Sequence, residues 1–139
     1  MGQDARMKLL RDVGIRHLVT VDPQVTLRHA ARAMMDRGVG CAVVIDGEQV
    51  AGIITERDIL RSVSQSQDLD AVLVGSAMTR HVVSGSPGWT LVQAVNAMVE
   101  GGFRHLLITE MDEPVGIVSL RDLMDSMVEM VQTQDTATA

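Results

Sequence analysis

The sequence predicts a mixed α/β (α+β) fold made of two βαββα repeats that pack sheet to sheet with pseudo-twofold symmetry. The first observation is an internal duplication. After a shift of 64 residues, Arg16–Ser62 aligns with Arg80–Ser126 without a gap, and 15 of the 47 positions are identical. The second is apolar patterning that alternates between helical spacing and short continuous runs. The third is that a three-stranded sheet with helices on one side leaves an apolar face, which a second copy can bury.

The first repeat contains signals for each of its five elements. A short apolar run ends before Pro23, and Thr26 can cap a helix whose apolar side chains share one face. Gly38 would end that helix, and an Asp46-Gly47 pair is typical of a hairpin turn. The first repeat therefore predicts strands over residues 18–21, 41–45 and 50–54, with helices after Thr26 and from Thr55.

The second repeat follows the same order. It predicts strands over residues 82–83, 105–109 and 115–118, with helices after Thr90 and from Ser119. Polar residues after the first copy indicate a loop, and a Thr- and Gln-rich end without periodicity indicates disorder. The expected organisation is a helical lead-in over 1–15, repeats over 16–66 and 80–128, a linker over 67–79, and a disordered tail over 129–139.

Composition argues against several classes of function. Twelve Lys and Arg residues against 18 Asp and Glu residues give a net charge of −6, which disfavours general nucleic-acid binding. Cys41 is the single cysteine, so neither an intramolecular disulfide nor a multi-cysteine zinc site can form. The four histidines are not at metal-ligand spacing. No apolar run approaches the length of a membrane span, and we expect a cytoplasmic protein.

The repeats resemble cystathionine-β-synthase (CBS) domains over about residues 10–128. The resemblance rests on a V-x-x-x-P-x-x-T-L opening at Val19–Leu27 and Val83–Leu91. It also rests on a G-h-h-[ST]-x-x-D element, where h is apolar, at Gly52–Asp58 and Gly116–Asp122, and on the F-R-H-L segment at 103–106. It implies a CBS pair, or Bateman module, which commonly binds adenosine nucleotides in clefts between its halves. Some members bind S-adenosylmethionine or NAD, and some bind no known ligand.

The Thr55 and Asp58 pair marks the first candidate site, and Ser119 with Asp122 marks the second. Each pair lies where a strand gives way to a helix, whose N-terminus carries unpaired N–H groups and a positive dipole. That end can seat a phosphate, and the carboxylate can accept hydrogen bonds from two ribose hydroxyls. The alternative is that Thr-x-x-Asp serves only as a variant capping box for the helix.

The resemblance implies that each site is completed by the other repeat. The first site would be closed by Val82, Val83, Arg104 and His105, and the second by Val19, Thr20, Gly40 and Cys41. Arg104 and His105 could face phosphate, or they could be solvated residues at a strand edge. The first site is therefore expected to bind a phosphorylated ligand more tightly.

Three kinds of function remain open. The first is a regulatory module that senses AMP, ADP, ATP, S-adenosylmethionine or NAD, with no cofactor required. The second is a scaffold with the same fold and no ligand, which mediates dimerisation or binds a partner. An enzyme is disfavoured because the sequence has no activated nucleophile, acid/base pair or cofactor motif. A homodimer is expected through apolar helical faces around Met34/Met35 and Met124/Met127, and a regulated partner protein is left unidentified.

Overall fold

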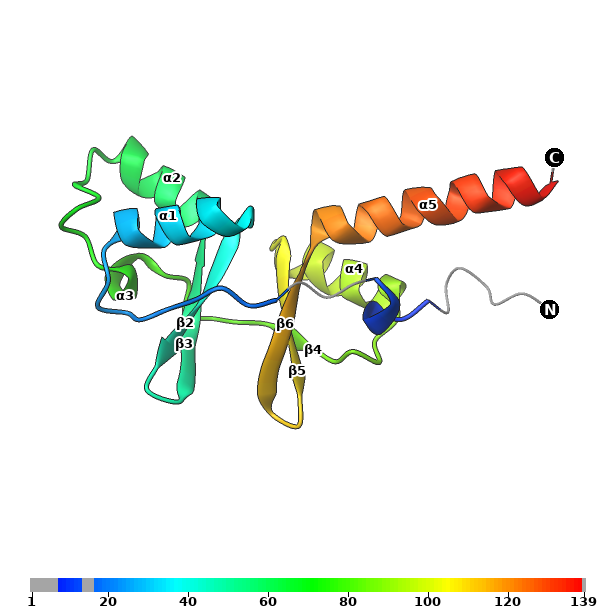
Figure 1. Cartoon of the computed structure of the whole chain (residues 1–139), viewed down its shortest axis with the longest axis horizontal. Helices are drawn as coiled ribbons and strands as arrows, with labels where there is room; N and C mark the ends of the chain where they lie inside the picture. Colours follow the sequence, from blue (N-terminus) through cyan, green and yellow to red (C-terminus); the bar gives the residue numbers. More distant parts are fainter. Residues whose placement is uncertain (1–7, 14–16, 139) are drawn as a thin grey trace. The chain divides into compact units, whose positions relative to one another are not determined.

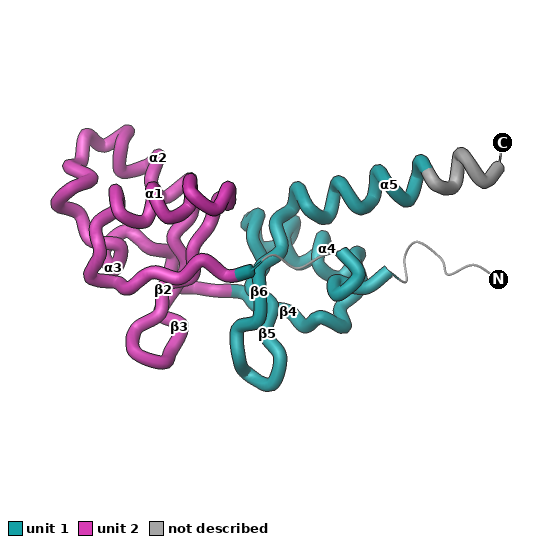
Figure 2. Tube along the Cα trace, in the orientation of Figure 1, with its two compact units in different colours: residues 1–17, 83–139 teal, residues 18–82 magenta. Residues whose placement is uncertain are grey.

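The computed structural model describes residues 8–13 and 17–138, with side chains through residue 132. The chain divides into two compact units (Figure 2). Unit 2 is continuous and spans residues 18–82, whereas unit 1 joins residues 1–17 to residues 83–139. Each unit holds one three-stranded sheet, so the predicted mixed α and β composition of two repeats is confirmed.

Unit 2 contains the first repeat (Figure 1). Its elements are β1 (Thr20–Val21), α1 (Leu27–Arg37), β2 (Cys41–Asp46), β3 (Gln49–Thr55), α2 (Glu56–Ser64) and α3 (Val74–Ala77). The sheet order is β1-β2-β3, with β1 parallel to β2 and β2 antiparallel to β3. One core joins Leu27 and Ala30 of α1 to Val44 and Ile54 of the sheet. The predicted βαββα order is thus confirmed here, and α3 is a helix that was not predicted.

Unit 1 repeats this arrangement around the second copy. It contains β4 (Ser84–Gly85), α4 (Leu91–Gly101), β5 (His105–Glu110), β6 (Glu113–Ser119) and α5 (Leu120–Thr138). The sheet order is β4-β5-β6, and the ladder is irregular at Ile108/Thr109 just as the first is at Val44/Ile45. The short strand begins at Ser84, two residues later than predicted, because only Ser84 and Gly85 pair with β5.

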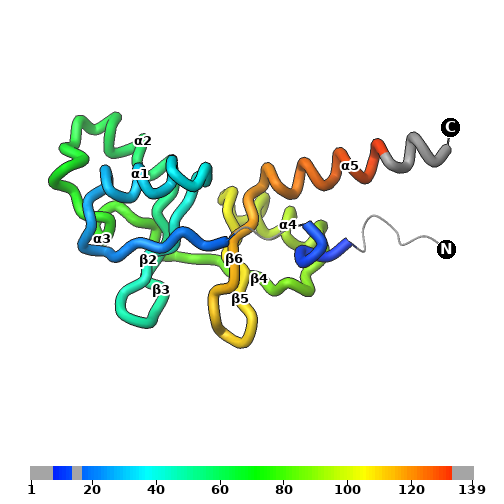
Figure 3. The backbone as a smooth tube through the Cα atoms, in the orientation of Figure 1, coloured from blue at the N-terminus to red at the C-terminus, as the bar shows by residue number. Residues whose placement is uncertain are grey.

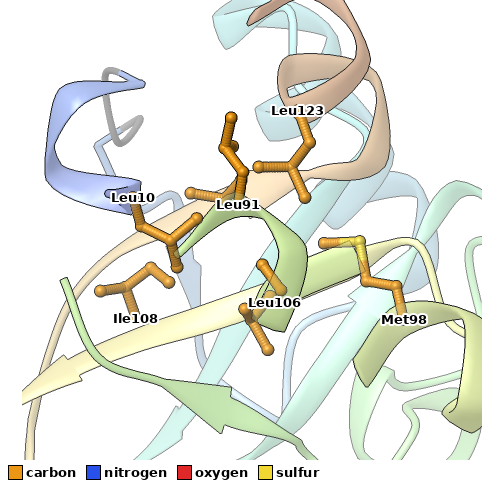
Figure 4. Close-up of a cluster of buried hydrophobic side chains, with 8 residues drawn as sticks. Leu10, Leu91, Met98, Leu106, Ile108 and Leu123 are labelled. Carbon is orange, nitrogen blue, oxygen red and sulfur yellow. The ribbon is translucent and has the colours of Figure 1, made fainter. Parts of the chain in front are cut away.

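The core of unit 1 includes a residue from far upstream in the sequence. Leu10 is fully buried among Leu91 and Met98 of α4, Leu106 and Ile108 of β5, and Leu123 of α5 (Figure 4). It belongs to a single 3-10 turn over Leu10–Asp12, which is the helical portion of residues 8–13, the described part of the predicted lead-in. The remainder of that prediction, over residues 1–7 and 14–15, lies outside the described residues.

The predicted linker over 67–79 is wrong in its second half. Residues 72–79 are part of unit 2, where Val74 is fully buried in the core and Leu27 donates its N–H to the Val72 carbonyl at 2.9 Å. In unit 1, Leu91 donates in the same way to Lys8 at 3.0 Å. Figure 3 shows the blue N-terminal segment beside α4. A short apolar segment therefore completes each unit, and the polar run that suggested a linker ends before it.

The predicted disorder of the tail is also wrong for residues 129–138, and residue 139 lies outside the described residues. Helix α5 continues to Thr138, ten residues beyond the position that corresponds to the end of α2. Residues 120–139 contain neither Gly nor Pro, and extending an existing helix costs much less than starting one. The absence of apolar periodicity in the tail was therefore a poor indicator of disorder.

Each sheet also has a second apolar face. Cys41, Val43 and Ile53 of unit 2 are buried without belonging to the core on the helical side, and so are Leu107 and Ile117 of unit 1. This pattern is the one that sheet-to-sheet packing requires, and the packing itself stays a prediction. None of the described helices is long and apolar enough to cross a membrane.

The methionines expected on exposed helical faces are divided between core and surface. Met34 is buried in the core of unit 2, so its assignment to an exposed face is wrong. Met35 is the next residue of α1 and is 80% exposed, and Met124 of α5 is 55% exposed. The reason is the helical period, which turns successive residues by about 100°.

Candidate functional site

Thr55 and Asp58 form a reciprocal cap at the start of α2. The Thr55 side-chain oxygen accepts a hydrogen bond from the Asp58 N–H at 3.2 Å, and the Asp58 carboxylate accepts from the Thr55 N–H at 3.0 Å. The two residues therefore satisfy two N–H groups that a helix end leaves without partners. The cap is thus formed in the structure, and ligand binding by the same two residues stays a prediction. The same arrangement also fixes the carboxylate at the positive end of the helix dipole.

Two further donors hold the Asp58 carboxylate. Arg61, one helical turn later, donates from Nη1 to Oδ1 at 3.1 Å, and the Thr79 hydroxyl lies 3.3 Å from both carboxylate oxygens. Asp58 is only 3% exposed, whereas the Arg61 side chain is 56% exposed. The carboxylate is thus the buried end of an ion pair whose cation reaches solvent.

Thr79 is a site residue that the sequence did not reveal. It reaches Asp58 because its backbone pairs with Ile53 of β3 through hydrogen bonds of 2.9 and 2.8 Å. A Cβ on Gly52 would lie 2.5 Å from the Thr79 carbonyl oxygen, so the segment can lie there only beside a glycine. The glycine of the G-h-h-[ST]-x-x-D element was the available signal, since a glycine inside a strand often indicates close backbone approach.

Gly40 and Cys41 lie in the same unit as this cap. The Glu56 N–H, at the first position of α2, donates to the Gly40 carbonyl at 2.9 Å, and Cys41 pairs with Thr55 across β2 and β3. Cys41 is 3% exposed, and burial together with the negative charge of Asp58 raises the pKa of its thiol to about 12. The thiol therefore stays neutral near pH 7 and is a poor nucleophile.

Ser119 and Asp122 form the equivalent cap at the start of α5. The Ser119 N–H donates to the Asp122 carboxylate at 3.0 Å, and the Asp122 N–H donates to the Ser119 hydroxyl at 3.1 Å. His105 pairs with Ser119 across β5 and β6, and the Leu120 N–H donates to the Arg104 carbonyl at 2.8 Å. Arg104 is exposed and His105 is half-buried.

The structure thus places the predicted site residues in two groups. Unit 2 holds Val19, Thr20, Gly40, Cys41, Thr55, Asp58 and Val82, and unit 1 holds Val83, Arg104, His105, Ser119 and Asp122. Val19 and Val83 occupy matching positions, because their carbonyls accept from Val43 at 2.8 Å and from Leu107 at 3.3 Å. The completion of each site by the other repeat stays a prediction.

A pocket of about 430 Å³ lies beside α2 within unit 2. Asp58, Arg61 and Ser62 line it from α2, Gln65 lines it just after the end of that helix, and Ser76 lies among the residues that line it from α3. Its volume lies in the range of small-molecule pockets, which are usually lined by more apolar side chains than this one. Among the described residues, no group of three or more His, Cys, Asp or Glu side chains is placed to hold a metal ion.

Comparison with known proteins finds matches along most of the chain. A family model described as the CBS domain matches residues 10–65 and 74–129. The solved structure of a CBS-domain containing protein, ATU1752 from Agrobacterium tumefaciens, is 30% identical with a TM-score of 0.83. That similarity covers 91% of this chain and 98% of the other. The second matched segment begins at residue 74, where the structure shows the apolar segment that joins the core of unit 2.

Two other solved structures share the fold and were determined with ligands. The CBS domain protein PAE2072 from Pyrobaculum aerophilum, complexed with AMP, is 23% identical with a TM-score of 0.75, over 89% of this chain and 98% of that one. The CBS domain pair of protein MJ0100, in complex with 5′-methylthioadenosine and S-adenosyl-L-methionine, is 18% identical with a TM-score of 0.81. That similarity covers 89% of this chain and 98% of the other.

Proposed function

The chain belongs to the CBS-domain family, and on this basis we propose that it is a regulatory module that binds an adenosine-type nucleotide. The two caps, Thr55 with Asp58 and Ser119 with Asp122, are the proposed ligand sites. AMP, ADP, ATP, S-adenosylmethionine and NAD are the candidate ligands, with none required for folding. The proposal includes no catalytic step.

The observation that carries the proposal is the position of Asp58 and Asp122. Each carboxylate lies at a helix N-terminus, where the dipole favours an anion such as phosphate, and each can accept hydrogen bonds from hydroxyl groups. An adenosine nucleotide offers a matching group for each feature. Its adjacent ribose hydroxyls can donate to the carboxylate, and its 5′ phosphate can lie at the helix N-terminus. AMP, methylthioadenosine and S-adenosylmethionine, the ligands in the two ligand-bound structures of the same fold, all contain adenine on a ribose with free 2′ and 3′ hydroxyls.

Exposed apolar side chains favour a second role in protein association. In unit 2, Met35 is 80% and Leu60 is 68% exposed, and in unit 1 the corresponding Val99 and Met124 are 72% and 55% exposed. Large exposed apolar patches typically mark protein–protein interfaces. We therefore propose a homodimer formed through these faces, which would act on a separate protein in the cytoplasm. A scaffold with no ligand is the alternative function.

A ligand screen tests the proposal and separates it from the scaffold alternative. We would measure the melting temperature of the wild-type protein with AMP, ADP, ATP, S-adenosylmethionine and NAD. A ligand at a hundred times its Kd stabilises the native state by about 2.7 kcal/mol, which raises the melting temperature by several degrees. The Asp58→Ala/Asp122→Ala double variant should lose that response. No shift with any of the five compounds would favour the scaffold.

A further inference from the structure

The Asp58 carboxylate has more donors around it than a ligand-free helix cap requires. It accepts from the Thr55 N–H, from the Arg61 guanidinium and from the Thr79 hydroxyl, which lies between its two oxygens. A carboxylate offers about four lone-pair positions. A ribose that brings two hydroxyl donors would raise the number of donors from three to five. At least one donor of the protein must therefore leave when such a ligand binds.

The Thr79 hydroxyl is the donor that is easiest to displace. Its distance of 3.3 Å to each oxygen is the longest of the contacts, and one proton is shared between two acceptors. Arg61 at 3.1 Å makes a charge-assisted bond, which is stronger than a neutral one. The Thr55 N–H at 3.0 Å is fixed by the start of the helix. Thr79 is also exposed, so its hydroxyl can turn to water.

We propose that Thr79 is a positioning residue of the Asp58 site, whose hydroxyl holds the carboxylate in the absence of ligand and gives way to the hydroxyls of a bound ribose. This inference rests on the proposed nucleotide binding and deepens it by naming a group that competes with the ligand. Because Thr79 precedes Val82, the last residue of unit 2, the competing group lies on the segment that leads into unit 1.

The proposal predicts that removing the Thr79 hydroxyl strengthens binding. Thr79→Val keeps the β-branched shape that suits its pairing with Ile53 but removes the donor. Calorimetric titration with AMP should show about two- to ten-fold tighter binding to Thr79→Val, the equivalent of one ordinary hydrogen bond. Thr79→Ser, which keeps the hydroxyl, is the matched control and should bind AMP as the wild type does.

A second nucleotide distinguishes competition from a general effect on the site. 2′,3′-Dideoxyadenosine 5′-monophosphate lacks both ribose hydroxyls, so its affinity should be the same for wild type and Thr79→Val. Weaker or unchanged AMP binding by Thr79→Val would overturn the proposal, because a ligand contact would be lost or no competition would exist. An equal gain for both nucleotides would overturn it too, since the effect would then not involve the ribose hydroxyls.

A stability measurement tests the contact without any ligand. Urea unfolding of Thr79→Val, Asp58→Asn and the double variant forms a double-mutant cycle. The two changes should be non-additive if Thr79 holds Asp58, and additivity would overturn that part of the proposal. If the wild-type protein binds no AMP, the proposed function is wrong, and so is the proposal that a ribose displaces the Thr79 hydroxyl. A non-additive cycle would then show that this failure lies in ligand binding and not in the contact.

Discussion

Leu10 and Val74, which lie 64 residues apart, occupy corresponding places in the cores of two different units. Each is fully buried, and each donates its backbone N–H at 2.8 Å to a carbonyl just before a long helix, Leu10 to Trp89 and Val74 to Val25. The repeat in the structure is therefore longer than the repeat in the sequence. Each unit is completed by the segment that precedes the other repeat along the chain.

Leu10→Ala should destabilise unit 1 although the residue lies about eighty positions from Leu91. Truncation of a fully buried leucine costs roughly 2–5 kcal/mol because it leaves a cavity. Urea unfolding followed by Trp89 fluorescence is the measurement, since Trp89 is the single tryptophan and packs against this core. Arg11→Ala, at an exposed neighbouring position, is the control. Equal midpoints for the two variants would show that the lead-in does not stabilise unit 1.

The parts of the fold that could be predicted from the sequence are those in which the two copies still share identical residues. Strands and helices between Thr26 and Asp58 were predictable because apolar periodicity and paired glycines recur in the second copy. The segments over 8–13 and 72–77 share only Leu9 with Leu73, so alignment of the two copies did not reveal their common role. Core packing requires only that each segment place an apolar residue at the buried position, which is Leu10 in one and Val74 in the other.

The candidate site was predictable in its cap and not in its surroundings. Thr55 and Asp58 lie three residues apart, a spacing that a helix N-terminus makes into a contact. Thr79 lies 21 residues after Asp58 and reaches it because its backbone pairs with Ile53, and no local pattern encodes such a contact. Pairing of this kind depends on tertiary structure, and only Gly52 indicated that a backbone passes close to the sheet.

Cys41 should make the protein less stable at alkaline pH. Burial raises the pKa of its thiol to about 12 in the native state, against an ordinary value of 9.0, so above pH 9 the unfolded chain binds fewer protons than the native one. Stability is therefore full below pH 9 and falls above it by about 1.4 kcal/mol per pH unit from this group. Urea unfolding between about pH 8 and 10.5, a range that brackets the ordinary thiol pKa, measures the slope.

Cys41→Ala is the control for that slope. The variant loses some stability from the small cavity, but the part of the pH dependence that comes from the thiol should disappear. A thiol reagent added to native protein near pH 8 should also react only as fast as the protein opens, because Cys41 is 3% exposed. Rapid stoichiometric labelling without denaturant would contradict the burial of this side chain.

Charges placed on the exposed helical faces should dissociate the proposed homodimer. Leu60→Glu in unit 2 and Met124→Glu in unit 1 replace apolar side chains that are 68% and 55% exposed, so neither change removes core packing. Light scattering at micromolar concentration should give a dimer mass for wild type and a monomer mass for at least one variant. Met111→Glu is the control, because this methionine is 93% exposed at a hairpin tip. A wild-type monomer would refute the proposed dimer.

The two candidate sites should differ in affinity for a phosphorylated ligand, with the Asp58 site the tighter. Asp58 is paired with Arg61, whereas the residue at the corresponding position after Asp122 is Asp125, so the local charge around α2 is the more favourable to an anion. The family resemblance further predicts that Arg104 and His105 complete the Asp58 site. Asp58→Ala should therefore reduce AMP binding more than Asp122→Ala, as measured by calorimetric titration.

Arg104→Ala tests the source of that difference. A charge-assisted hydrogen bond to phosphate is worth roughly 1.5–3 kcal/mol, or about one to two decades in affinity. The variant should bind AMP more weakly by about that factor. Its affinity for adenosine, which has no phosphate, should be nearly unchanged. Arg104 is exposed, so its replacement should leave the fold intact.

Loss of AMP binding in Asp122→Ala with full binding in Asp58→Ala would reverse the ranking of the two sites, because the ligand would then occupy the site beside α5. Unchanged binding in both variants would mean that these carboxylates serve only as helix caps, and the scaffold function would be the better explanation.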